Sequence, residues 1–106
     1  DLRGAIEAYR AGLEFYPTSS GWLGLGLTQQ NLGQVDQAER AYAKAVELEP
    51  RNAAAQRRYG LVLLATGRPE AAVRALGNAA RLEPGDREIA AELAEAQAAL
   101  QRNVGS

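Results

Sequence analysis

A segment of 34 residues repeats along this chain, and this repeat limits the possible folds more than any other feature of the sequence. Gly26 recurs as Gly60, and the Leu-Glu-Pro triplet at 48–50 returns at 82–84, each 34 residues later. About ten of the 34 positions are identical in the two copies. A partial copy over residues 1–17 lies 33 residues before its match. Such a period predicts a stack of similar structural units, because one short unit cannot bury its apolar face alone.

Residues that break or start helices recur with the same period. Pro17, Pro50 and Pro84 cannot continue a helix, so each predicts a stop. Gly33 and Gly67 suit the left-handed residue that follows many helices. The expected N-cap residues are Thr18, Asn52 and Asp86. We therefore expect helices at 2–15, 19–32, 35–48, 52–66, 69–82 and 86–102, followed by a frayed tail at 103–106.

The residues at these spacings resemble the tetratricopeptide repeat over almost the whole chain. Trp22 and Leu25-Gly26 match the first-helix pattern of the family, and the second-helix pattern is matched by Ala38, Tyr42, Ala45 and Pro50. Departures from the pattern are Gln29 and Leu63 in place of tyrosine, Gln56 in place of tryptophan, and Leu76 in place of an aromatic residue.

The resemblance implies an all-α fold, a right-handed α-solenoid of stacked antiparallel helix hairpins, in a single domain. Residues 1–17 would be the second helix of a partial repeat, 18–51 and 52–85 two full repeats, 86–102 a capping helix and 103–106 a tail. The first helix of the partial repeat is missing. We favour its lying upstream in a longer protein; the alternative is that the exposed side of helix 2–15 contacts another subunit.

Composition excludes several classes of function. The net charge of −1 argues against a nucleic-acid binder and against a polybasic membrane patch. The chain has no cysteine or histidine, which removes disulfides and thiolate or imidazole metal sites, so we expect no metal and no cofactor. No apolar run approaches the roughly 20 residues of a membrane span.

The first residue and the composition of the chain bear on its origin. It begins with Asp1 and contains no methionine, so we expect an excerpt of a longer protein without its targeting segment. The cytoplasm and the periplasm both remain open as compartments. Arginine far outnumbers lysine, which occurs only at Lys44, and alanine is abundant; both features favour a GC-rich bacterial gene.

Catalysis is the function class with the least support. No histidine is present to act as a base at neutral pH. The hydroxyls at 19–20 follow a proline and begin a helix, so capping explains them better than nucleophilic attack. The glycines at 24 and 26 lie inside an expected helix with no strand before it, which excludes a dinucleotide-binding loop. We expect no enzyme.

Binding of a protein or peptide partner is the function that the resemblance implies, because first helices in this family line a concave groove. The partner-binding residues carried over from it are Leu23, Leu27, Gln30 and Asn31, then Arg57, Arg58, Leu61 and Leu64, and finally Glu92 and Glu95. Packing between first helices is an equally good explanation for Leu61 and Leu64, and a weaker one for Leu23 and Leu27. The alternative for the arginines and glutamates is that they are ordinary charged surface residues in contact with solvent and bind no partner.

Some relatives hold chaperone C-terminal tails in a clamp of lysine, asparagine and arginine side chains. The matching positions here are Leu23, Leu27, Arg58, Glu88 and Glu92, so carboxylates stand where cations are needed. We therefore expect no chaperone-tail binding. The runner-up function is self-association through the unpaired front helix or the groove.

Overall fold

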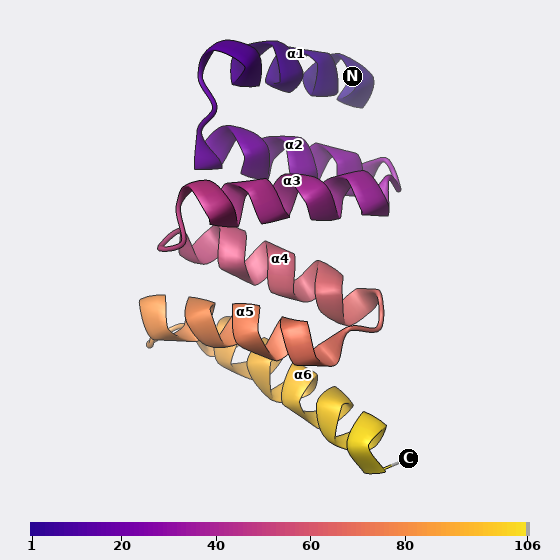
Figure 1. Ribbon diagram of the computed structural model, residues 1–106, viewed down its shortest axis with the longest axis vertical. Helices are drawn as coiled ribbons and strands as arrows, with labels where there is room; N and C mark the ends of the chain where they lie inside the picture. Colours follow the sequence, from indigo (N-terminus) through magenta and orange to yellow (C-terminus); the bar gives the residue numbers. More distant parts are fainter. Residues whose placement is uncertain (106) are drawn as a thin grey trace.

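The computed structural model describes residues 1–105, which form six helices joined by short turns and contain no strand (Figure 1). The helices are α1 (Leu2–Phe15), α2 (Ser19–Asn31), α3 (Val35–Leu48), α4 (Ala53–Ala65), α5 (Pro69–Leu82) and α6 (Arg87–Gly105). The all-α prediction is confirmed. The largest difference is in α6, which continues through residues 103–105, expected as a tail; Ser106 lies outside the described residues.

The expected N-caps start α2, α4 and α6. Thr18 Oγ1 accepts a hydrogen bond from the Gly21 N–H at 2.9 Å, and Asn52 Oδ1 accepts one from the Ala55 N–H at 3.1 Å. The carboxylate of Asp86 caps α6 in the same way. Each of these bonds satisfies an N–H group that has no partner inside the helix.

Both hairpins turn through the same backbone geometry. Gly33 and Gly67 have φ values of 79° and 81°, a region that glycine enters without steric cost. The following N–H donates back into the preceding helix, from Gln34 to the carbonyl of Gln29 at 2.8 Å in the first hairpin. The second hairpin repeats this bond one period later, at 2.9 Å. The turn is therefore encoded within each repeat.

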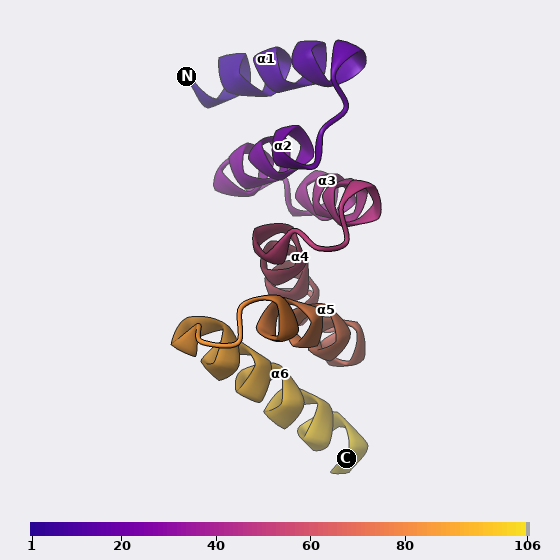
Figure 2. The same cartoon turned by 90° about the vertical axis from the view of Figure 1, so that its left-hand side faces the viewer.

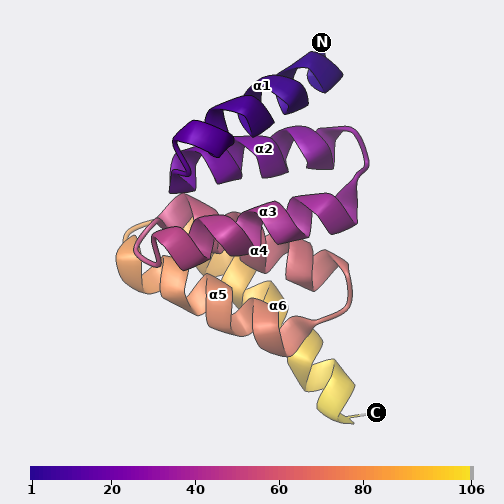
Figure 3. The same cartoon turned by 45° about the horizontal axis from the view of Figure 1, so that its top comes forward.

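The helices stack in chain order into an α-solenoid with extents of 45 × 27 × 20 Å (Figures 1 and 3). Each helix packs against the next, and α2–α3 and α4–α5 are the two complete hairpins. In addition, α2 contacts α4 and α4 contacts α6. These three helices therefore share one side of the stack. In Figure 2, α2 on this side lies to the left of α3.

A close approach between helices builds each hairpin. Tyr42 is fully buried, and a Cβ added to Gly26 would lie 2.5 Å from its Cε1 atom. In the second hairpin, a Cβ on Gly60 would lie 2.6 Å from Cγ of the buried Leu76. Glycine is thus needed at this position of the first helix, because any larger side chain would separate the two helices.

We predict that Gly26→Ala destabilises the fold by about 1–3 kcal/mol, since the added methyl collides with a buried ring that has no room to move. Urea unfolding followed by circular dichroism measures the change. Gly12→Ala is the matched control: Gly12 lies in α1 with nothing within 4 Å of a built Cβ, so alanine should stabilise α1 by about 0.5–1 kcal/mol. Equal stability of wild type and Gly26→Ala would contradict the steric explanation.

Candidate functional site

The side of the stack formed by α2, α4 and α6 carries all ten residues expected to bind a partner. The half-buried ones are Leu23, Leu27, Arg57, Arg58, Leu61, Leu64 and Glu92, and the exposed ones are Gln30, Asn31 and Glu95. We call the side defined by these ten residues the first-helix face. Because α4 contacts both α2 and α6, side chains from three helices lie on one continuous surface.

The four leucines of this face also belong to the core. Leu23 and Leu27 pack against a buried cluster that includes Tyr42. Leu61 and Leu64 pack against the next cluster, around Leu76. A packing role was expected mainly for Leu61 and Leu64, and Leu23 and Leu27 have it as well. Since all four remain only half-buried, each keeps apolar surface open to solvent.

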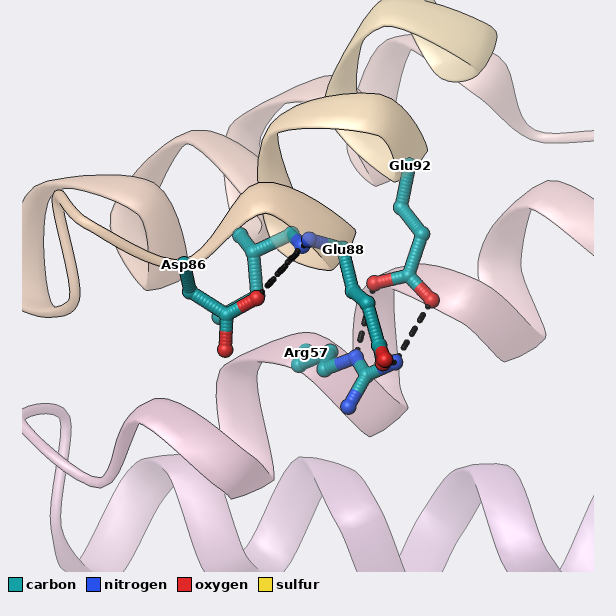
Figure 4. Close-up of polar contacts among 5 residues, drawn as sticks. Arg57, Asp86, Glu88 and Glu92 are labelled. Atoms are coloured by element: carbon teal, nitrogen blue, oxygen red, sulfur yellow. Dashed lines mark hydrogen bonds and ion pairs between the residues drawn. The ribbon is translucent and has the colours of Figure 1, made fainter.

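Arg57 does not stand free on the face but is bound by two carboxylates of α6 (Figure 4). Its Nε and Nη2 donate to Glu92 at 2.7 and 2.9 Å, and Nη2 also donates to Glu88 at 3.0 Å. The side chains of Arg57 and Glu92 are 25% and 20% exposed, so solvent screens this bidentate ion pair only in part. The hydrogen bonds that Arg57 donates to Glu92 raise the pKa of Arg57 above its ordinary value; burial offsets part of this effect, and the contacts to Glu88 add to it.

The pairing of Arg57 with Glu92 was missed in the sequence, although the sequence holds its signal. The two residues are 35 positions apart, one repeat plus one residue. Residues at this separation lie side by side on neighbouring first helices, so opposite charges there predict an ion pair. Asp86 assists the arrangement, because its Oδ1 accepts from the N–H groups of Glu88 and Ile89 and so fixes the start of α6 (Figure 4).

Arg58, the neighbour of Arg57, forms no ion pair within residues 1–105. It lies near the buried ring of Tyr42: burial raises the pKa of the Tyr42 phenol, and the charge of Arg58 offsets part of this effect. The Tyr42 hydroxyl donates to Gln30 Oε1 at 2.6 Å, which fixes the amide of Gln30 at the edge of the face. Arg58 is therefore a cation available to a partner.

The hydroxyl of Ser19 has a structural role. It donates to the carbonyl of Ala45 at 2.8 Å and accepts from Asn52 Nδ2 at 2.9 Å, so it ties the start of α2 to the end of α3 and the start of α4.

Within the described residues, no three side chains of the kinds that bind metals lie together. Among residues 1–105, no helix has the length and apolar character needed to cross a bilayer.

Comparisons with known proteins agree with this architecture. The structure of the first TPR of Spaghetti (RPAP3) bound to the HSP90 peptide SRMEEVD is 25% identical, with 94% of this chain and 80% of that chain covered and a TM-score of 0.87. The first TPR domain of human RPAP3 (24% identity, 99% and 84% covered, TM-score 0.87) has the same fold. So does MamA (20% identity, 94% and 55% covered, TM-score 0.86).

These likenesses confirm the right-handed α-solenoid expected from the sequence. No curated protein sequence matches significantly. The tetratricopeptide repeat model matches residues 23–87 and 60–105, which together cover most of the chain. The spacing of its glycines, its capped hairpins and this match agree, and the chain belongs to the tetratricopeptide repeat family.

Proposed function

We propose that the first-helix face is the concave groove of a protein-interaction scaffold, and that it binds a peptide or a helix of a partner protein. The observation that carries the proposal is the contact of α4 with both α2 and α6, which joins half-buried leucines and exposed polar groups into one surface. Peptide sites combine an apolar floor with a few polar groups in this way. A similar domain is bound to a peptide.

The charges of the face favour a partner with a basic group at the α6 end. There, Glu88 and Glu92 hold Arg57, and the exposed Glu95 adds a third carboxylate. At the α2 end, Leu23 and Leu27 offer apolar surface and no charge. We therefore propose a partner segment that is apolar at one end and basic at the other, because complementary charge sets the direction of binding.

We predict that Leu27→Glu weakens peptide binding by at least about tenfold, since it places a charge on the apolar part of the face. Peptides selected from a random displayed library on the wild-type chain would be titrated by calorimetry against wild type and variant. Arg74→Ala, on α5 and away from the face, is the control and should bind as wild type does. Circular dichroism verifies folding of each variant. Unchanged affinity in both Leu27→Glu and Leu23→Glu would remove this face from the binding site.

We also predict that the chaperone peptide SRMEEVD does not bind with micromolar affinity. Its two glutamates and terminal aspartate would meet Glu88 and Glu92, and Arg57 is already held by both. The double substitution Glu88→Lys and Glu92→Lys supplies cations at these positions and should raise the affinity for this peptide at low salt. Micromolar binding by the wild-type chain would contradict the charge argument.

Self-association through α1 is a second candidate function, favoured by an uncovered face on this helix. Ala38, Tyr42 and Ala45 of α3 are fully buried, whereas their equivalents Ala5, Tyr9 and Gly12 of α1 are half-buried or exposed. The aromatic side chains that follow at 15 and 16 are 74% and 76% exposed. An apolar face of this kind is typical of an interaction surface.

The contact that fits this face is α1 of a second copy. At the equivalent of Gly60, α6 carries Ala94, whose methyl would collide with an aromatic ring packed as Tyr42 packs on Gly26. Gly12, by contrast, has nothing within 4 Å of a built Cβ. The ring of Tyr9 packs on Gly24 of its own chain but remains 38% exposed, so two copies of α1 can place the exposed edge of Tyr9 of one against Gly12 of the other, in a self-complementary interface.

If α1 pairs in this way, sedimentation velocity of the wild-type chain should show a monomer–dimer equilibrium that depends on concentration. Gly12→Gln should shift it to monomer, because the side chain fills the space for the second tyrosine without meeting any neighbour in its own chain. Glu83→Gln, in the loop after α5, is the control that should leave the equilibrium unchanged. A monomer mass at all concentrations would remove this function for residues 1–106.

A further inference from the structure

A cleft with a volume of about 510 Å³ lies between α1, α2 and α3, away from the residues of the first-helix face. Its apolar wall is formed by Leu13 from α1 together with Trp22 and Leu25 from α2. Leu13 and Leu25 form a buried cluster with Ile6 and Ala41, and Trp22 packs against this cluster while remaining partly buried. The volume falls within the range of roughly 300–1,000 Å³ that is usual for ligand sites.

The equivalent place in the next repeat serves as an internal control. The cleft between α3, α4 and α5 is formed by residues one repeat later but has a volume of only about 270 Å³. Gln56 replaces Trp22 there and is satisfied within the protein, since it donates to the carbonyl of Pro50 at 2.9 Å. Leu63 replaces Gln29 and is buried in the core. The first cleft thus has the larger volume of the two. It is lined by the polar side chain of Gln29 at the position where the second cleft is lined by Leu63.

That polar group has no partner. Gln29 is 3% exposed, its Oε1 is buried without a hydrogen bond, and its side chain makes none within residues 1–105. A buried amide is normally satisfied, and leaving it unpaired disfavours the folded state. The fold does not require an amide, because Leu63 occupies the same position one repeat later. An amide offers a donor and an acceptor together, which complements a peptide group.

Positive charge surrounds this cleft. Arg10, Arg40 and Lys44 line it against the single carboxylate of Glu14. Lys44 is engaged with Glu47 at 3.6 Å, but Arg10 and Arg40 form no ion pair within the described part of the chain. Two free guanidinium groups above an apolar wall favour a ligand that carries a carboxylate.

We propose that this cleft binds an acidic peptide segment of a partner protein. An apolar side chain of the segment lies against Trp22, a peptide group bonds to Gln29, and a flanking carboxylate pairs with Arg10 or Arg40. The site is separate from the first-helix face, so one chain can hold a basic segment on that face and an acidic one in the cleft.

The test uses Trp22, the only tryptophan of the chain, as an internal reporter. Its fluorescence would be followed during titration of the full chain with acetyl-Asp-Leu-Glu-amide, acetyl-Asn-Leu-Gln-amide and acetyl-Lys-Leu-Lys-amide. The expected order of affinity is acidic, neutral, basic, with the first two separated by about tenfold at low salt. Gln29→Leu, which copies the next repeat, should fold and weaken all binding. Arg40→Gln should weaken binding of the acidic peptide only.

Leu27→Glu separates this inference from the proposed function, because it changes the first-helix face and should leave these titrations unchanged. Loss of binding to the cleft in that variant would overturn the separation of the two sites. No change in Trp22 emission with any of the three peptides would overturn the proposal. Equal affinity of wild type and Gln29→Leu would also overturn it, because a water-filled cleft with no specific contact to the amide then explains the structure.

Discussion

The close approach of the two helices in each hairpin determines the rest of this structure. Tyr42 and Leu76 fit into spaces that exist only because Gly26 and Gly60 lack side chains. This contact sets the distance within each hairpin, and the fully buried alanines of α3 and α5 fill the remaining space. Since both hairpins have the same geometry, first helices meet first helices along the stack, and the first-helix face follows from that repetition.

Features with a local cause could be predicted well. The caps at Thr18 and Asn52 and the left-handed glycines depend only on a few neighbouring residues, and the structure confirms them. The end of α6 was predicted less well for a related reason. Gln101 stands one repeat after Gly67, so the residue that ends α4 has no counterpart in α6 and the helix continues to Gly105.

Features that depend on two distant side chains were harder to predict. Arg57 was expected to meet a partner, but its contacts to Glu92 and Glu88 are visible only when α4 and α6 are placed side by side. The sequence showed Gln29 as a departure from the tetratricopeptide pattern, without showing that its amide lacks a hydrogen bond. Whether a substitution in a repeat is neutral depends on what surrounds it, and a repeat pattern alone cannot report that.

The two full repeats use their departures from the pattern in opposite ways. In the second, the departures are satisfied internally: Gln56 bonds to Pro50, and Leu63 packs in the core. In the first, the departure Gln29 remains without a hydrogen-bond partner. A solenoid can tolerate such a difference because each repeat contacts only its neighbours, so the unpaired amide of one repeat need not alter the packing of the next. The unpaired amide is therefore confined to α2, at the cleft with α1 and α3, while the first-helix face extends over α2, α4 and α6.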